Sequence, residues 1–168
     1  MQHTEAYLAT FAQKESQRFK LKTGVFLFLI QDNHILLLRR YKTGIDDGNY
    51  LVPMGSIEGG ETLTYAIMRE AQEEANIILE PTDLRVCHIM HRYHPMPKNL
   101  SFEQIDVYFY ATTYTGIIKN NEPHKCDDLA FFPIDDLPKN IVPFIQSALE
   151  HMQKGTMFSE FGWPPKTY

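Results

Sequence analysis

Two apolar, β-rich runs stand near the beginning of the chain. They are TGVFLFLI at residues 23–30 and HILLLRR at residues 34–40, and their aromatic and branched aliphatic side chains favour strands. The short polar segment between them contains Asp32 and Asn33, which suit a tight turn. The pattern predicts a β-hairpin with at least one buried strand.

Four later segments also predict strands. A short strand is expected near residues 50–52, within a long loop at 41–56 that Gly, Asp and Pro punctuate. LRVCHIMHRY at 84–93 and EQIDVYFYATTY at 103–114 follow, and the second is rich in aromatic and β-branched residues. LAFFPI at 129–134 predicts a last short strand.

The first residues predict an amphipathic helix. Residues 4–18 place Tyr7, Leu8 and Phe11 at helix-like intervals among polar residues, with Phe19 just beyond. We expect this helix to pack on the domain or on a partner chain.

Two further helices are expected. Residues 62–75 contain no Gly or Pro and are rich in Ala, Glu, Met, Leu and Gln, which favour a helix. Asn76 suits the left-handed conformation in which many helices end. Residues 141–153 predict a terminal helix that stops before Gly155.

The order of strands, helix, strands and helix predicts an α+β fold with helices against a mixed sheet. A chain of 168 residues without repeats or linkers fits one domain. We expect that domain at residues 21–155, with an N-terminal helical extension at 1–20 and a C-terminal tail at 156–168. The extension and the tail segment FSEFGWPP, with Trp163, are candidate contacts of a homodimer, and packing on their own domain is the alternative.

Composition excludes several classes of protein. The net charge is −5 and no stretch is rich in Lys and Arg, which argues against binding to duplex nucleic acid. Two cysteines are too few for a disulfide framework and indicate a reducing compartment. The N-terminus lacks a continuous apolar segment, and no apolar run approaches the roughly 18 residues of a membrane span. We therefore expect a cytoplasmic protein without membrane contact.

An acidic cluster occupies the predicted helix at 62–75. Glu70, Glu73 and Glu74 are three and four positions apart, so on a helix their carboxylates project from one side. A solvated acidic face is the ordinary explanation, since like charges at these spacings cost only about 0.2–0.5 kcal/mol per pair.

The residues around this cluster favour a metal site instead. Glycines and further carboxylates lie upstream, namely Gly55, Glu58, Gly59, Gly60 and Glu61. Carboxylates and exposed carbonyls form a hard-oxygen environment that suits Mg²⁺ or Mn²⁺ rather than zinc. Arg69 precedes Glu70 directly and can hold a carboxylate in a fixed rotamer.

The spacing of these residues resembles the signature of the Nudix hydrolase superfamily. Gly55 is followed after five residues by Glu61, and after seven more by REAQEEANI, which begins at Arg69. The resemblance implies an α/β/α sandwich that cleaves a pyrophosphate bond in a nucleoside diphosphate linked to another group. Two positions depart from the family pattern: Asn76 stands where glycine is usual, and Met54 replaces the first glycine of a common Pro-Gly-Gly.

The resemblance also implies individual roles. The implied ligands of Mg²⁺ or Mn²⁺ are the carboxylates of Glu70, Glu73 and Glu74 and the carbonyl oxygen of Gly55. Glu70 would also lie near enough to act on water. Arg69 would orient a carboxylate of the motif, Glu73 or Glu61.

A downstream segment, NNEPHKCDDLAFFPIDDLP at 120–138, resembles MutT-like members that act on nucleoside triphosphates. Those relatives commonly have Glu-Pro-Glu-Lys, and His124 replaces the second Glu here. Glu122 is a candidate to supply a carboxylate to a metal ion or to the attacking water. An ordinary loop residue before a rigid Pro is an equal alternative.

Several residues are candidates to bind substrate. Arg39, Arg40 and Lys125 can reach phosphates, although adjacent strand residues point to opposite faces, so one of the two arginines is expected to face solvent. Tyr93 or Phe102 can stack on a base, with core packing as the alternative.

The favoured reaction is therefore hydrolysis of a nucleoside triphosphate to the monophosphate and pyrophosphate. ADP-ribose, a nucleotide sugar, a dinucleoside polyphosphate or a capped RNA end is the alternative substrate. A non-catalytic nucleotide-binding module is the alternative class, but such modules typically lose motif carboxylates, and this chain retains all of them.

Overall fold

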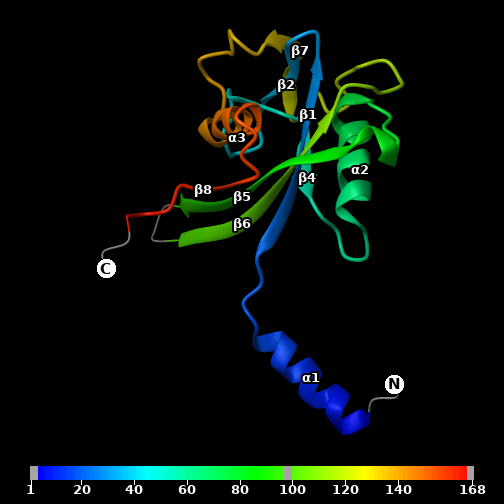
Figure 1. The fold of residues 1–168 in the computed structure, drawn as a ribbon, viewed down its shortest axis with the longest axis vertical. Coiled ribbons are helices and arrows are strands. Elements are labelled where there is room, and N and C mark those ends of the chain that lie inside the picture. The colour runs from blue at the N-terminus through cyan, green and yellow to red at the C-terminus, as the bar shows by residue number, and fades with distance from the viewer. Residues whose placement is uncertain (1–3, 97–99, 166–168) are drawn as a thin grey trace.

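The computed structural model describes residues 4–96 and 100–165 (Figure 1). The helices are α1 (Glu5–Gln17), α2 (Leu63–Ala75) and α3 (Pro143–Gln153), with a 3₁₀ turn, η1, at Pro81–Asp83. The strands are β1 (Lys22–Gln31), β2 (His34–Arg40), β3 (Tyr50–Leu51), β4 (Met54–Ser56), β5 (Arg85–Met96), β6 (Leu100–Ala111), β7 (Cys126–Pro133) and β8 (Phe158–Phe161). The ends of the predicted extension and tail, residues 1–3 and 166–168, lie outside the described residues, as do 97–99.

The strands form a mixed sheet in the order β3-β2-β1-β6-β5-β8, with β4 paired to β1 and β7 paired to β2. The predicted hairpin of β1 and β2 is confirmed, and Asp32 and Asn33 form its two-residue turn with φ angles of 47° and 60°. Such left-handed pairs match the twist of a hairpin, and Asn and Asp adopt them at low cost. Beyond the turn, β1 pairs in parallel with β6, whereas β2 pairs with β7.

β1 forms the centre of the fold because both of its faces are buried. Val25, Leu27 and Leu29 belong to one hydrophobic core, and Phe26 and Phe28 belong to the other. The first core includes Ala66, Ile67, Ala71 and Ala75 of α2, and the second includes Phe144, Ile145, Ala148 and Leu149 of α3. The two helices therefore cover opposite faces of the sheet (Figure 1), which confirms the predicted α/β/α sandwich.

Local signals set both ends of α2, and the sequence predicted the one at Asn76. The hydroxyl of Thr62 accepts a hydrogen bond from the backbone N–H of Tyr65 at 3.2 Å and caps the first turn. Asn76 ends the helix with a φ angle of 55° in the left-handed region. Its side chain also donates to the carbonyl of Ile117 at 2.9 Å. Asparagine thus takes the conformation that glycine usually supplies.

The structure adds strand pairing that the sequence did not predict. β4 lies in the segment predicted as loop and pairs with β1, from Gly24↔Ser56 to Phe26↔Met54. β7 begins at Cys126 rather than at 129 because its ladder with β2 extends to Arg40. β5 is longer than predicted and β6 begins and ends three residues earlier, and the two pair from Arg85↔Tyr110 to Met96↔Leu100 with an irregularity between Val86 and His88.

The segment predicted as a C-terminal tail adds an edge strand to the sheet. β8 pairs in parallel with β5, from Ile89↔Phe158 to Arg92↔Phe161. Just beyond it, the indole N–H of Trp163 donates to the carbonyl of His91 at 3.0 Å. This C-terminal segment therefore packs on its own domain, which was one of the two alternatives predicted for it.

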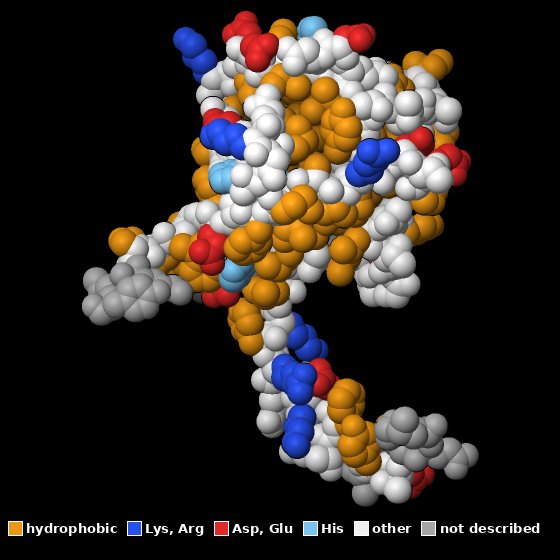
Figure 2. Space-filling view, in the orientation of Figure 1, with side chains coloured by type: hydrophobic (Ala, Val, Ile, Leu, Met, Phe, Trp, Pro, Cys, Tyr) orange, Lys and Arg blue, Asp and Glu red, His pale blue; other side chains and the backbone are white. Residues whose placement is uncertain are grey.

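The N-terminal helix α1 stands apart from the sheet (Figure 1). Its exposed apolar residues include Leu8 and Phe11, which are 50% and 49% exposed. Figure 2 shows hydrophobic side chains along this helix and Lys and Arg side chains toward its junction with the sheet. The predicted homodimer stays a prediction. Among the described residues, none of the helices is long and apolar enough to cross a membrane.

The packing of the C-terminal segment predicts a large effect of Gly162→Ala. Gly162 has a φ angle of 78°, and a Cβ there would lie 2.2 Å from the carbonyl oxygen of Tyr93. We expect the free energy of unfolding, measured in urea, to fall by about 2 kcal/mol. The control is Gly59→Ala, because a Cβ there meets nothing within 4 Å. Equal stability of the two variants would contradict the described packing of this segment.

Candidate active site

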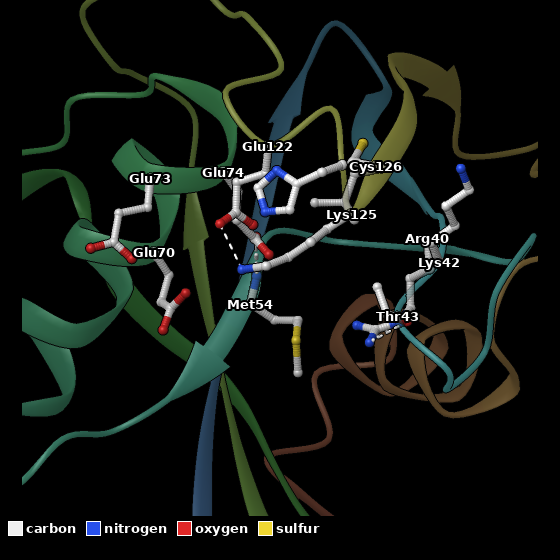
Figure 3. Close-up of a pocket in the computed structure, with 12 residues that line it drawn as sticks. Arg40, Lys42, Thr43, Met54, Glu70, Glu73, Glu74, Glu122, Lys125 and Cys126 are labelled. Atoms are coloured by element: carbon white, nitrogen blue, oxygen red, sulfur yellow. Dashed lines mark hydrogen bonds and ion pairs between the residues drawn. The ribbon is translucent and has the colours of Figure 1, made fainter.

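A cavity of about 550 Å³ lies between α2, the end of β2 and the loop before β7 (Figure 3). Its lining divides by chemistry into four carboxylates (Glu70, Glu73, Glu74 and Glu122), four basic side chains (Arg40, Lys42, His124 and Lys125) and the less polar residues Leu38, Thr43, Met54 and Cys126. Arg40, Lys42 and Thr43 lie on the side opposite Glu70 and Glu73 (Figure 3). The cavity therefore has an acidic side and a basic side.

Glu74 is held by the backbone at the junction of α2 and β4. Its carboxylate accepts a hydrogen bond from the N–H of Met54 at 2.9 Å. Loss of solvent is the main reason that the pKa of Glu74 is raised to about 8; the hydrogen bond from the Met54 N–H lowers this pKa, and the nearby charges of Glu70 and Glu122 raise it. The departure from the family pattern at Met54 thus leaves a backbone donor for the acidic cluster.

Glu70 lies against the backbone of Gly55. A Cβ at position 55 would come within 1.9 Å of the Glu70 carboxyl carbon, so glycine is required for this close approach. Burial raises the pKa of Glu70, while the hydrogen bond from Arg69 works in the opposite direction.

Arg69 connects the carboxylates of the signature to one another. Its Nε and Nη2 donate to Glu61 at 3.2 and 2.9 Å, and its Nη1 donates to Glu70 at 2.8 Å and to Glu73 at 3.3 Å. A further bond from Nη2 reaches the carbonyl of Ser56 at 3.2 Å. The fork geometry of guanidinium makes this possible, and a lysine could not reproduce it. Arg69 also lowers the pKa of Glu61.

The loop before β7 brings a fourth carboxylate to the cavity. Glu122 lies across from α2 and accepts a hydrogen bond from the ammonium group of Lys125 at 2.7 Å. The N–H groups of Lys125 and Cys126 donate to the carbonyl of Glu122 at 2.8 and 2.9 Å, which fixes a tight turn. The sequence predicted Glu122 and Lys125 at the site, and both line the cavity with His124.

The two arginines that end β2 point to opposite sides, as strand geometry requires. Arg40 lines the cavity. Arg39 instead pairs with Asp127 at 2.7 Å and lies over the ring of Tyr50, 5.7 Å from its centroid. The structure does not bring Arg39 to the cavity.

Tyr93 and Phe102 are not brought to the cavity either. They lie near the end of β5 and the start of β6, where the ring of Tyr93 is 5.3 Å from that of Trp163 and the ring of Phe102 is 4.8 Å from that of His94. These aromatic residues serve packing at that end of the sheet, so the predicted stacking on a base has no support at this cavity.

Sequence reasoning missed other residues of the lining. Thr43 and Lys42 follow β2 in a segment that appeared only as a Gly- and Asp-rich loop, and Leu38 and Cys126 appeared only as strand and loop residues. The one available signal was position, because a loop that directly follows Arg40 has to pass the same cavity.

The donor set suits a hard divalent cation. Four carboxylates line one cavity, and the raised pKa of Glu74 reflects the cost of ionising a carboxyl group that is buried there. Among the described residues, no three His, Cys, Asp or Glu side chains are already arranged to hold an ion. Arg69 and Lys125 contact three of the four carboxylates at present. An ion would therefore compete with these two cations.

Comparisons with known proteins agree with this geometry. The family model for the NUDIX domain matches residues 20–152. An ADP-ribose pyrophosphatase of Methanocaldococcus jannaschii is 29% identical over 109 residues, which cover 65% of this chain and 60% of that protein. The human 8-oxo-dGDP phosphatase NUDT18 is 26% identical over 140 residues, covering 76% of this chain and 38% of that protein.

Solved structures show the same fold. A MutT Nudix hydrolase from Burkholderia pseudomallei superimposes with a TM-score of 0.70 at 26% identity, covering 79% of this chain and 98% of that chain. A MutT protein from Bacillus halodurans superimposes with a TM-score of 0.69 at 18% identity, covering 86% and 92% of the two chains. The chain belongs to the Nudix hydrolase family, whose model covers more than half of it. The predicted family is confirmed, and the matched regions span 60% of the relative from Methanocaldococcus jannaschii and 38% of the human relative.

The raised pKa of Glu74 predicts a pH-dependent effect of Glu74→Gln in metal-free protein. The folded state keeps a proton on Glu74 up to about pH 8, whereas the unfolded state loses it near an ordinary glutamate pKa of about 4.5. Wild-type stability should therefore fall as pH rises from about 5 to about 8. The variant lacks this loss, so its stability relative to wild type should increase over that range by at least about 1 kcal/mol.

Urea unfolding in EDTA at both pH values measures this difference. The matched control is Glu73→Gln, since the Glu73 side chain is 55% exposed and loses little solvation on folding. A difference between wild type and Glu74→Gln that does not change with pH would contradict the burial of this carboxylate.

Proposed function

We propose that the protein is a Mg²⁺- or Mn²⁺-dependent hydrolase that cleaves a pyrophosphate bond in a nucleotide. The favoured substrate is a nucleoside triphosphate, which would yield the monophosphate and pyrophosphate. The observation that carries this proposal is that four carboxylates line one cavity together with Arg40 and Lys42, which lie on the side opposite Glu70 and Glu73 (Figure 3). An acidic side can hold divalent cations while a basic side receives phosphate oxygens.

The carboxylates would hold the metal ions. We assign this role to Glu70, Glu73, Glu74 and Glu122, with the carbonyl of Gly55 as a further ligand. When bound, such ions neutralise phosphate charge and lower the pKa of a coordinated water. Glu70 has a pKa that burial raises, and it is the candidate to accept a proton from water.

Other residues would position the substrate and the ligands. Arg69 contacts Glu61, Glu70 and Glu73 at once, so it fixes the orientation of the carboxylates rather than touching substrate. Arg40 would contact phosphate oxygens from the basic side, and Lys125 would contact them from beside Glu122. Hydrolysis then adds water across the P–O–P bridge, and the phosphorus–oxygen bond to the leaving phosphate breaks.

Two observations keep a second substrate class in view. The relative from Methanocaldococcus jannaschii is named an ADP-ribose pyrophosphatase, and the human relative is named an 8-oxo-dGDP phosphatase. The segment from Glu122 to Lys125 resembles triphosphate-specific MutT-like members and favours the first class. ADP-ribose is the second candidate, because both substrates present a diphosphate to the same two sides of the cavity.

We place the activity in the cytoplasm. The supporting observation is that Cys87 and Cys126 are both free thiols, as expected in a reducing compartment.

A panel of substrates tests the proposed function. Nucleoside triphosphates, ADP-ribose, nucleotide sugars and dinucleoside polyphosphates are incubated with Mg²⁺, with Mn²⁺ and with EDTA, and the nucleotide products are separated by chromatography, because ADP-ribose would give AMP and ribose 5-phosphate rather than free phosphate or pyrophosphate. Metal-dependent release of pyrophosphate from a triphosphate supports the favoured substrate. Turnover of ADP-ribose alone supports the second candidate, and no turnover of any substrate with either metal contradicts the proposal.

Within this panel, Glu73→Gln is expected to reduce kcat by at least about 100-fold while the urea midpoint stays nearly unchanged. The reason is that Glu73 lines the cavity but is largely exposed, so it contributes more to charge at the site than to folding. Glu58→Gln is the matched control, because it removes a carboxylate from the adjacent exposed loop, outside the cavity lining. Full activity of Glu73→Gln would refute the assignment.

A further inference from the structure

The loop at residues 41–49 has an unusual backbone. Lys42, Gly44, Asp46 and Gly48 all have positive φ angles, between 55° and 83°. Two of these residues are not glycine, and each such conformation costs roughly 1 kcal/mol or more. A loop of this kind persists only where surrounding contacts hold it, and such contacts often occur at functional sites.

Asp47 supplies these contacts. Its carboxylate accepts hydrogen bonds from the N–H of Thr43 at 2.8 Å and from the N–H of Gly44 at 2.9 Å. The hydroxyl of Thr43 lies 2.7 Å from the same carboxylate. These bonds lower the pKa of Asp47. One exposed side chain therefore fixes the first half of the loop.

Thr43 in turn holds Arg40. Its hydroxyl oxygen accepts from Nε of Arg40 at 3.1 Å and from Nη2 at 2.9 Å. The carbonyl of Ile45 accepts from the same Nε at 2.6 Å. Within the described part of the chain, Nη1 of Arg40 makes no hydrogen bond, although Arg40 lines the cavity.

Arg40 differs from two other cations nearby, Arg39 and Lys125, in the charge of its direct partners. Arg39 contacts the carboxylate of Asp127, and Lys125 contacts that of Glu122, so each is already paired with a negative charge. The direct partners of Arg40 are a hydroxyl and a carbonyl, both neutral. Its guanidinium is thus fixed in place with its positive charge available to an anion in the cavity.

We propose that Asp47 is a positioning residue for substrate binding. By fixing Thr43 it orients Arg40 so that the cavity presents a preorganised guanidinium to a phosphate group of the substrate. This inference rests on the proposed function, because it specifies how the basic side of the same site receives phosphate. Preorganisation strengthens binding since the side chain loses no further freedom when the phosphate arrives.

The test compares Asp47→Asn with Asp46→Asn. Both variants remove one negative charge from the same loop, but the Asp46 carboxylate does not take part in the contacts of Thr43 and Gly44. Asparagine also tolerates the left-handed backbone of position 46. For the nucleoside triphosphate turned over best, Asp47→Asn should raise KM about tenfold with kcat within about twofold. Asp46→Asn should leave both constants near those of wild type.

A double-mutant cycle separates positioning from general loop stability. If Asp47 acts through Arg40, Asp47→Asn should change KM by less than about twofold when Arg40 is already replaced by Gln. A second tenfold loss in the Arg40→Gln background, or an equal loss in Asp46→Asn, would overturn the inference.

Binding of pyrophosphate in saturating Mg²⁺, followed by calorimetry, gives a readout that does not depend on turnover. Asp47→Asn should weaken this binding about tenfold, and Asp46→Asn should not. If the wild type binds pyrophosphate with this pattern but hydrolyses no nucleotide, the inference stands and the proposed function fails. If the wild type hydrolyses a nucleotide while Asp47→Asn retains wild-type KM and pyrophosphate affinity, the proposed function stands and the inference fails.

Discussion

The burial of neighbouring carboxylates is the constraint on which the site depends. Loss of solvent is the main cause that raises the pKa of Glu74, and repulsion from the charges of Glu70 and Glu122 raises it further. Burial strengthens this repulsion because the protein screens charge less than water does. The fold compensates in part with the guanidinium of Arg69, the ammonium of Lys125 and the N–H of Met54. A divalent cation bound here would offset the cost of ionising these buried carboxylates.

The packing of α2 and the pairing of the strands next to it position the two sides of the cavity. α2 packs through alanines and Ile67 on β1, and its buried side leaves the glutamates facing the cavity and the loops. β4 brings Gly55 against Glu70 because it pairs with the same central strand. The ladder of β2 with β7 sets Arg40 opposite Cys126 and so aligns the basic side with the loop that carries Glu122. The acidic side of the cavity therefore depends on α2 and β4, which both contact β1, whereas the basic side depends on the pairing of β2 with β7.

Much of this could be predicted from sequence because the signals were local. The turn at Asp32 and Asn33, the cap at Asn76 and the spacing from Gly55 to Glu74 depend on neighbours in the chain. The family followed from that spacing.

Features that depend on distant pairing could not be predicted. β4 and β8 are short and become strands only through β1 and β5. The choice between Arg39 and Arg40 required the register of β2, since a change of one residue exchanges the two faces. Tyr93 and Phe102 looked like base-stacking residues, but the length of the β5–β6 hairpin carries them toward the far end of the sheet. The conformation of the 41–49 loop depends on contacts between Asp47 and Thr43 that no simple pattern indicates.

The most direct test of the central claim is the position of bound metal. Crystals of the protein with Mn²⁺ and a non-hydrolysable nucleoside triphosphate would be measured near the manganese absorption edge. If these carboxylates hold the metal ions, anomalous peaks are expected between Glu70, Glu73, Glu74 and Glu122, with phosphate oxygens turned toward Arg40. Manganese bound elsewhere, or a nucleotide whose phosphates avoid this cavity, would contradict it.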